Sequence, residues 1–269
     1  MLRGAVAMPS GKRDPVVRPI PLSRRAQMIL AIDAGNTRIK WGLWDRRWVR
    51  QQSVNTDDIA SLGDVWAGLP TPLRVVACNV AGPKPRDWLD AWAEQRGQTV
   101  YWVESRTEQC GVRNGYSDPA QLGPDRWAAL VAARGLARGA ALVVNAGTAV
   151  TVDALTRDGE FVGGLILPGL ALMTESLARG TARLPHARGC FELFPRSTAD
   201  AITSGATQAV CGAVERMYRA LAARELEPEI LLGGGAAELL APHIDLPLRL
   251  VPNLVLEGLR VIAQEEQAA

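Results

Sequence analysis

The sequence predicts an α/β protein with two lobes, each built around the same structural unit. Two observations support this fold class. Residues 28–45 (MILAIDAGNTRIKWGLWD) have the pattern of a strand, a glycine turn and a second strand, and residues 141–155 (ALVVNAGTAVTVDAL) repeat it. Strand-like and helix-like segments alternate along the rest of the chain, as they do in α/β proteins. We therefore expect an internal duplication, with lobes at residues 28–140 and 141–269.

The glycine turn of the first hairpin differs from the loops of the two commonest nucleotide-binding folds. In a P-loop or a Rossmann unit such a turn opens a helix, whereas here apolar residues alternate after it, at Ile39, Trp41 and Leu43. Neither GxxxxGKS/T nor GxGxxG occurs in the chain. Asp33-Ala34-Gly35-Asn36 aligns with Asn145-Ala146-Gly147-Thr148, and the duplication predicts that both turns face a common cleft between the lobes.

The other elements follow from periodicity and turn residues. The expected elements are a strand at 73–77, helices at 87–94 and 125–138, a turn into a helix within 162–180, a long amphipathic helix at 198–227, and a strand at 229–232 that ends in a third glycine turn. The apolar face of the long helix can pack either on the core or on a second subunit.

Charge and composition disfavour several classes of partner. Residues 1–27 contain six basic residues, one acidic residue and four prolines. We expect this extension to be disordered, and Met28, which opens the first patterned segment, is an alternative start of translation. The rest of the chain is slightly acidic, so we expect no nucleic-acid partner. With no signal peptide or membrane-spanning run in the sequence, we expect no membrane partner and a cytoplasmic protein.

The first glycine turn has the residues needed to bind a phosphate group. Gly35 lets the backbone approach an anion closely, and Asn36, Thr37 and the backbone amides can donate hydrogen bonds. Lys40 adds a positive charge, and the carboxylate of Asp33 suits a magnesium ion held partly through water. The alternative is an ordinary hairpin turn, against which the second copy at residues 145–148 argues.

The segment GPDRW at residues 123–127 is the other candidate site. Asp125 stands at the start of an Ala-rich helix, where it can act as an N-cap. It can equally orient a substrate hydroxyl and accept its proton late in a phosphoryl transfer. Arg126 is unfavourable in the positive first turn of a helix unless an anion or a carboxylate lies nearby. The residues alone leave both interpretations of Asp125 open.

Seven motifs together resemble a known family. In chain order they are DAGNTRIK, NGY, GPDR, NAGTAVTVD, GGLILPG, STADAITSG and LLGGG. The ordered set resembles type III pantothenate kinase and covers the chain from Met28 onward. The resemblance implies a duplicated ribonuclease H-like fold of the actin-like ATPase type and a homodimer. It also implies the ATP-dependent phosphorylation of pantothenate to 4'-phosphopantothenate, the first step of coenzyme A synthesis.

The resemblance further implies roles for individual residues. The residues implied to bind ATP are Asp33, Ala34, Gly35, Asn36, Thr37, Arg38, Ile39, Lys40 and Thr148. Asp125 is the implied catalytic proton acceptor, and the pantothenate contacts fall on Tyr116, Gly123, Pro124, Asp125 and Arg126. Thr198 is expected to contact pantothenate from the neighbouring subunit, which would tie activity to the dimer.

The sequence departs from the family at Asn145. The family commonly has an aspartate before AGT that binds a required potassium or ammonium ion, whereas this chain has a neutral amide there. An amide oxygen lacks the charge of a carboxylate and binds a cation more weakly. We therefore expect only a weak dependence on the monovalent cation.

Two other functions are compatible with the same residues. A phosphohydrolase of this fold would use Asp125 to orient water instead of an alcohol. A non-catalytic transcription accessory factor would retain the nucleotide site without the reaction. The presence of Asp33, Lys40, Asp125 and Arg126 together favours the kinase.

Overall fold

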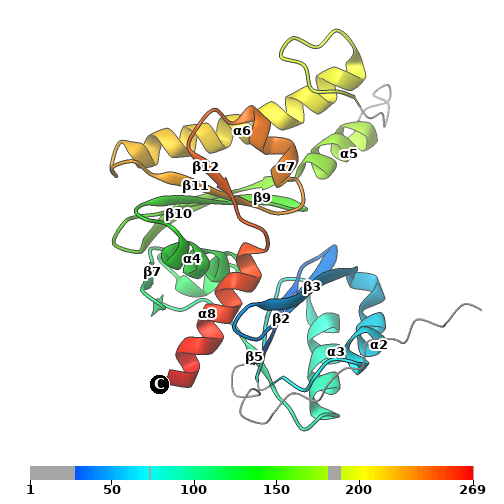
Figure 1. Cartoon of the computed structure of the whole chain (residues 1–269). Coiled ribbons are helices and arrows are strands. Elements are labelled where there is room, and N and C mark those ends of the chain that lie inside the picture. Colours follow the sequence, from blue (N-terminus) through cyan, green and yellow to red (C-terminus); the bar gives the residue numbers. More distant parts are fainter. Residues whose placement is uncertain (1–27, 73, 181–188, 269) are drawn as a thin grey trace, which may run out of the picture.

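The protein consists of two sheets with helices between them and on their outer faces (Figure 1). The structure is a computed structural model that describes residues 28–72, 74–180 and 189–268. Residues 1–27, which we expect to be disordered, therefore lie outside the described residues. So does residue 73, the first residue of the strand expected at 73–77. Among the helices of the described part, none is long and apolar enough to cross a membrane.

The first sheet has the strand order β3-β2-β1-β4-β5. Its strands are β1 (Ile29–Ala34), β2 (Arg38–Trp44), β3 (Trp48–Asn55), β4 (Arg74–Asn79) and β5 (Val100–Trp102). β1, β2 and β3 pair antiparallel, whereas β4 and β5 continue parallel to β1. Its outer face packs on η1 (Thr56–Ser61), α2 (Leu62–Ala67) and α3 (Pro83–Glu94) in a cluster rich in tryptophan.

The second sheet repeats this order as β10-β9-β8-β11-β12, and β7 and β6 extend it beyond β10. These strands are β6 (Glu108–Gln109), β7 (Val112–Asn114), β8 (Ala141–Ala146), β9 (Ala149–Leu155), β10 (Glu160–Pro168), β11 (Glu229–Gly233) and β12 (Leu248–Leu250). β8, β9 and β10 pair antiparallel, and β11 and β12 run parallel to β8. Order and direction both recur, so the predicted duplication is confirmed.

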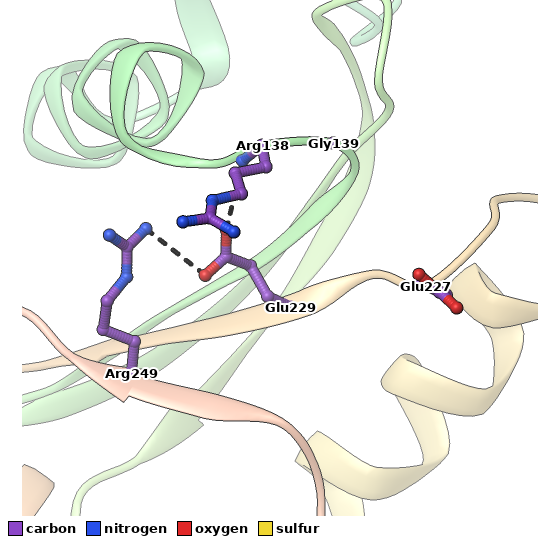
Figure 2. A pocket seen from close by; sticks show the side chains of 5 residues that line it. All are labelled: Arg138, Gly139, Glu227, Glu229 and Arg249. Carbon is purple, nitrogen blue, oxygen red and sulfur yellow. Dashed lines mark hydrogen bonds and ion pairs between the residues drawn. The ribbon is translucent and has the colours of Figure 1, made fainter.

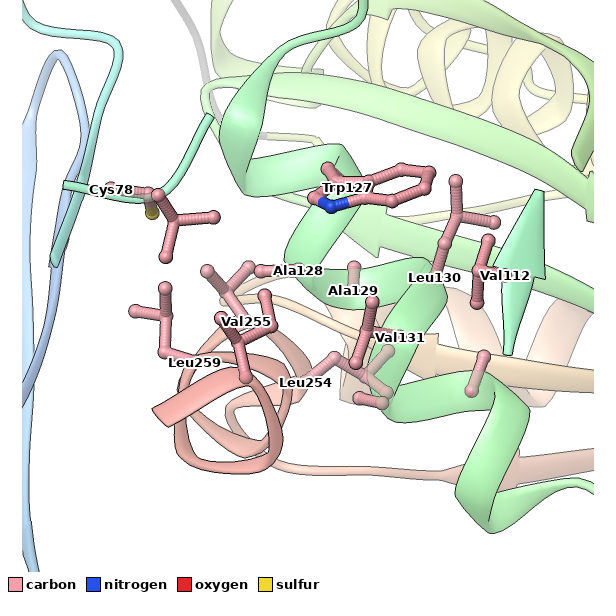
Figure 3. Packing of buried hydrophobic residues seen from close by; sticks show 14 of the residues in the cluster. Cys78, Val112, Trp127, Ala128, Ala129, Leu130, Val131, Leu254, Val255 and Leu259 are labelled. Carbon is pink, nitrogen blue, oxygen red and sulfur yellow. The ribbon is translucent and has the colours of Figure 1, made fainter. Parts of the chain in front are cut away.

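Two helices, α4 (Pro124–Leu136) and α8 (Leu254–Ala268), lie between the sheets. They share one core with Ile29 and Val76 of the first sheet and Val143 and Leu231 of the second. Figure 3 shows this packing from close by. A Cβ atom on Gly258 would lie 1.7 Å from the carbonyl oxygen of Ala128, so glycine is what allows the two helices to cross closely.

The outer face of the second sheet packs on further helices. They are α5 (Leu170–Gly180), α6 (Thr198–Ala222) and α7 (Ala237–Leu240), with η3 (Ala241–His243) after α7. A separate short helix, η2 (Pro119–Gln121), precedes α4. The long helix expected at 198–227 is confirmed as α6, which ends five residues earlier than expected, at Ala222. The helix after the third glycine turn is only four residues long.

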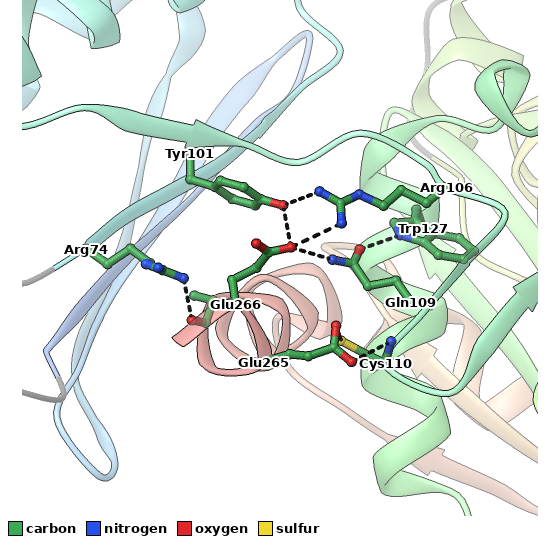
Figure 4. Close-up of polar contacts among 9 residues, drawn as sticks. Arg74, Tyr101, Arg106, Gln109, Cys110, Trp127, Glu265 and Glu266 are labelled. Carbon is green, nitrogen blue, oxygen red and sulfur yellow. Dashed lines mark hydrogen bonds and ion pairs between the residues drawn. The ribbon is translucent and has the colours of Figure 1, made fainter. Parts of the chain in front are cut away.

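Polar contacts connect the last turns of α8 with both halves of the molecule (Figure 4). The carboxylate of Glu266 accepts hydrogen bonds from Tyr101 of β5 at 3.0 Å and from Gln109 of β6 at 3.4 Å. Gln109 in turn accepts a hydrogen bond from the indole of Trp127 in α4 at 3.1 Å. Arg74 of β4 donates to the carbonyl of Ala263 at 2.8 Å. α8 therefore contacts both sheets, and the lobe boundary at residue 140 stays a prediction.

Candidate active site

The first turn, Gly35–Thr37, joins β1 to β2 and presents its polar side chains to solvent. The amide of Gly35 donates to the carbonyl of Arg38 at 3.1 Å, and Asn36 and Thr37 are exposed. The guanidinium of Arg38 lies against Ser53 of β3, with N to Oγ distances of 2.6 and 3.1 Å. Ile39 is completely buried, so only its backbone is available to a nucleotide.

Asp33 and Lys40 face each other across this hairpin, because the register pairs them. Asp33 is only 8% exposed, and its carboxylate accepts a hydrogen bond from the thiol of Cys78 at 3.6 Å. Burial raises the pKa of Asp33 to about 6; Lys40 opposes this rise and the nearby charge of Asp125 adds to it. Asp125 therefore lies close enough to Asp33 for their charges to interact.

The second turn, Gly147–Thr148, contacts the first turn directly. The hydroxyls of Thr37 and Thr148 are 2.9 Å apart. Asn145 occupies in β8 the place that Asp33 occupies in β1, one residue before the end of the strand, and it is half-buried. The predicted convergence of the two glycine turns is therefore confirmed by this contact.

Two more glycine turns pack against the second one. The amide of Ala236, in the third turn, donates to the carbonyl of Ala146 at 3.0 Å. Gly234 has φ +96°, and a Cβ atom there would lie 2.4 Å from that carbonyl oxygen. The amide of Gly169 donates to the carbonyl of Thr148 at 2.8 Å. Three glycine turns thus meet around the end of β8, and their small residues let the backbone segments approach one another closely.

Asp125 lies in the first turn of α4 but does not cap it. The N-cap is Gly123, Pro124 is the first helical residue, and no side chain caps this end of the helix. A Cβ atom on Gly123 would lie 2.6 Å from Oδ1 of Asp125, so glycine leaves room for that carboxylate. Asp125 is half-buried and makes no side-chain hydrogen bond to any described residue. The N-cap interpretation is therefore wrong, and the carboxylate is available to a ligand.

Arg126 is buried beside the carboxylate partner that its position in the helix requires. Its Nε and Nη2 atoms donate to the two oxygens of Asp153 in β9, at 3.2 and 2.5 Å. Its Nη1 atom donates to the hydroxyl of Tyr116 at 3.1 Å. Burial raises the pKa of Asp153 to about 6, which the guanidinium opposes. The structure thus places three of the predicted substrate residues, Tyr116, Asp125 and Arg126, side by side.

Thr198 does not belong to this group within one chain. It is the exposed first residue of α6, capped by Ser197, whose hydroxyl accepts the amide of Asp200 at 3.1 Å. None of the described hydrogen bonds or ion pairs connects it with Asp125 or Arg126. The expectation that it acts in a neighbouring subunit stays a prediction.

Three residues of the site escaped sequence reasoning: Cys78, Asp153 and Gly164. Cys78 follows the apolar run of β4 and shows no polar pattern of its own. Asp153 did carry a signal, since it is an acidic residue inside an otherwise apolar or small-residue strand. A buried carboxylate in a strand requires a partner, and Arg126 was the cation in need of one.

A cavity of about 360 Å³ lies elsewhere on the second lobe (Figure 2). Arg138, Gly139, Glu227, Glu229 and Arg249 line it, and none of them is a predicted site residue. Glu229 pairs with Arg249 at 3.3 Å and accepts the amide of Arg138 at 3.2 Å. This cavity adjoins the start of β8, whereas the second turn follows its end, so it is separate from the candidate site.

The comparisons with known proteins agree with this geometry. Residues 29–220 match the family model of type III pantothenate kinase. The chain belongs to this family. A type III pantothenate kinase from Aromatoleum aromaticum is 49% identical over 243 residues, which cover 90% of this chain and 100% of that protein. The family predicted from the seven motifs is thereby confirmed.

Solved structures share the fold of this chain at much lower sequence identity. A Campylobacter jejuni protein described as a Baf family transcriptional activator superposes with TM-score 0.60 at 20% identity, covering 89% of this chain and 100% of the other. A Sinorhizobium meliloti protein described as a 2-dehydro-3-deoxygalactonokinase gives TM-score 0.58 at 15% identity, covering 90% and 100%. These likenesses confirm the predicted actin-like fold with two lobes.

A type III pantothenate kinase uses ATP with a divalent metal ion, and the residues present suit both. Within residues 28–72, 74–180 and 189–268, no three His, Cys, Asp or Glu side chains form a metal site by themselves. A magnesium ion bound with a nucleotide takes one or two carboxylates, phosphate oxygens and water. Asp33 would supply such a carboxylate, partly through water, and the ion would neutralise charge on the phosphates.

Proposed function

We propose that this protein transfers the γ-phosphoryl group of ATP to the primary hydroxyl of pantothenate. The products are ADP and 4'-phosphopantothenate, in the first step of coenzyme A synthesis. The observation that carries this proposal is the uncapped carboxylate of Asp125, which lies close enough to Asp33 and to Asp153 for their charges to interact. Family membership supports the same reaction.

In this reaction the protein positions its two substrates and neutralises charge. Thr37 of the first turn, Lys40 of β2 and Thr148 of the second turn would hold the phosphates of ATP. Asp125 would orient the hydroxyl of pantothenate for in-line attack on the γ-phosphorus and take its proton as the bond to ADP breaks. Because the transition state is loose, the proton moves late and Asp125 need not be a strong base.

The active form is proposed to be a cytoplasmic homodimer in which Thr198 contacts pantothenate bound to the partner subunit. Exposed apolar side chains support such an interface. Ile166 of β10 is 65% exposed, and Leu193 and Phe194, just before α6, are 65% and 83% exposed. β10 and α6 both contact α5, so these residues belong to neighbouring elements of one lobe.

A complementation assay tests the shared site. Asp125→Ala and Thr198→Ala should each be inactive, yet mixing them should restore activity. A hybrid dimer has one site with both residues intact, so an equimolar mixture should regain about one quarter of the wild-type activity. No recovery after subunit exchange, confirmed by mass spectrometry of the mixed dimers, would show that Thr198 does not act in the site of the partner subunit.

The proposed reaction itself is tested by measuring ADP release from Mg-ATP with and without pantothenate. Release that depends on pantothenate supports the kinase. Equal release without pantothenate would identify a phosphohydrolase, in which Asp125 orients water. No release under either condition, from protein that still binds nucleotide, would favour the non-catalytic accessory factor.

A further inference from the structure

A polar cluster lies next to the proposed catalytic carboxylate of Asp125. Its members are Tyr116, Arg126, Asp153 and Gly164. Asp153 lies in the middle of the second sheet, where the register pairs it with Val143 of β8 and Gly164 of β10. It is 1% exposed and Arg126 is 5% exposed. A charge pair of this kind costs desolvation energy and contributes little net stability compared with apolar residues. Its presence here therefore calls for a functional explanation.

Gly164 gives this pair its space. A Cβ atom at this position would lie 2.0 Å from Oδ1 of Asp153 and 3.0 Å from Nη2 of Arg126. Gly164 does not have the positive φ that would require glycine for backbone reasons, in contrast to Gly163 at φ +126°. The absence of a side chain at residue 164 is thus explained by the ion pair together with the carbonyl oxygen of Val152, which would lie 2.7 Å from the added Cβ.

The hydrogen bonds of Arg126 to Asp153 and Tyr116 determine which of its N–H groups remain available to a ligand. Guanidinium has five N–H groups, of which Nε–H and one on Nη2 bind Asp153, and one on Nη1 binds the Tyr116 hydroxyl. One N–H on each Nη atom is left, and together they form the planar fork that matches a carboxylate or a pair of carbonyl oxygens. Asp153 holds the guanidinium by its other edge, so this fork is fixed in one orientation.

We propose that Asp153 is a positioning residue for the acceptor substrate. It would act through Arg126, which it orients together with Tyr116, so that the remaining fork binds the acidic or amide oxygens of pantothenate. The inference rests on the proposed function, because it needs pantothenate as the ligand of Arg126. It predicts that Asp153 controls the KM for pantothenate, while the KM for Mg-ATP depends on the two turns instead.

Two variants separate position from charge. Asp153→Asn keeps size and one acceptor oxygen but loses the charge. Gly164→Ala keeps every charge but crowds both the carboxylate of Asp153 and the backbone carbonyl of Val152, and so pushes the carboxylate away from Arg126. Both should raise the KM for pantothenate by about tenfold or more, the effect of losing a hydrogen bond to a charged group. Both should leave the KM for Mg-ATP within about twofold. Glu160→Gln, which removes an exposed carboxylate of the same sheet paired to Arg113 at 3.9 Å, is the matched control and should change neither.

A double-variant cycle tests whether Asp153 acts through Arg126. In the background of Arg126→Gln, adding Asp153→Asn should give no further rise in the KM for pantothenate. Additive effects, or a normal pantothenate KM in both Asp153→Asn and Gly164→Ala, would overturn the inference. Failure of all these variants to fold, judged by circular dichroism, would likewise overturn it and assign the pair to the core.

Failure of the proposed function gives a different result. In that case the wild-type protein itself shows no pantothenate-dependent ADP release, and the inference falls with it. Wild-type turnover with unchanged pantothenate KM in folded variants refutes the role of Asp153 and leaves the proposed function intact.

Discussion

The hydroxyl oxygens of Thr37 and Thr148 lie 2.9 Å apart, although the residues are 111 positions apart in the sequence. This hydrogen bond joins the turn that follows β1 to the turn that follows β8, the equivalent strand of the other sheet. Each hydroxyl has one O–H group, so a phosphate that accepts from both would replace the hydrogen bond between them. The contact therefore marks the point where the two repeats would hold ATP together.

Removing either hydroxyl should weaken ATP binding and leave the acceptor unaffected. Thr37→Val and Thr148→Val are each expected to raise the KM for Mg-ATP by roughly tenfold, since each loses a hydrogen bond to a charged group. The KM for pantothenate should stay unchanged in steady-state assays. Ser61→Ala, which removes an exposed hydroxyl of η1 bonded to the carbonyl of Asp58, is the control. A rise in pantothenate KM alone would contradict the assignment of these turns to the nucleotide.

The carboxylate of Asp125 should be essential for turnover and dispensable for folding. Asp125→Ala removes no capping bond, so its melting temperature should stay close to that of the wild type. Its kcat should fall by about 10² to 10⁴, the usual contribution of a group that transfers a proton. Parallel loss of stability and activity would instead indicate a structural residue.

Gly123→Ala should reduce activity because it displaces the carboxylate of Asp125. The added Cβ would meet Oδ1 of Asp125 at 2.6 Å and displace it. Gly135→Ala in the same helix is the matched control, because a Cβ there meets no atom within 4 Å. This control should keep full activity and gain about 0.5–1 kcal/mol of stability, measured by chemical denaturation. Equal activities of the two variants would show that the position of Asp125 is not critical.

Part of this fold was predictable because its signals are local, namely both hairpins, β4, β11 and the helices α3, α4, α5 and α6. β3, β5, β10, β12 and α8 were not predicted. Alternating apolar residues and small turn residues define both hairpins, and their similarity reveals the duplication before any contact is known. β6 and β7 were missed because strands of two and three residues have no measurable period. The partnership of Arg126 with Asp153 was also missed, since pairing across 27 positions depends on how α4 packs on β9. Sequence showed the need for a partner without showing which carboxylate meets it.

The raised pKa of Asp33 predicts how stability depends on pH in the absence of metal and nucleotide. The pKa is about 6 in the folded protein against 3.8 ordinarily, so between these values the folded state holds a proton that the unfolded chain has released. This contribution to stability is complete below pH 4 and is lost as the pH rises through 6. Asp33→Asn removes the titration and should therefore gain stability relative to the wild type as the pH rises.

Melting curves in EDTA at pH 4.5, 5.5 and 7.0 test this sign. The difference in melting temperature, Asp33→Asn minus wild type, should grow by more than about 2 °C from the lowest to the highest pH. Asp57→Asn changes an exposed carboxylate of η1 and should show a constant difference. If this difference in melting temperature instead shrinks as the pH rises, the folded state stabilises the charged form of Asp33 and the expected sign is wrong.

Asn145 predicts a weak response to potassium. Its amide takes the place in β8 that the carboxylate of Asp33 takes in β1, next to Gly233 of β11 and Thr151 of β9. A neutral oxygen attracts a monovalent cation less strongly than a carboxylate does. The kcat/KM of the wild type should therefore change by less than about threefold between zero and 100 mM potassium chloride. Tetramethylammonium chloride keeps the ionic strength constant in this series. Asn145→Asp restores the charge and should introduce steep, saturable activation by potassium. Equal, steep activation of both proteins would show that neighbouring carbonyl groups bind the ion without the help of residue 145.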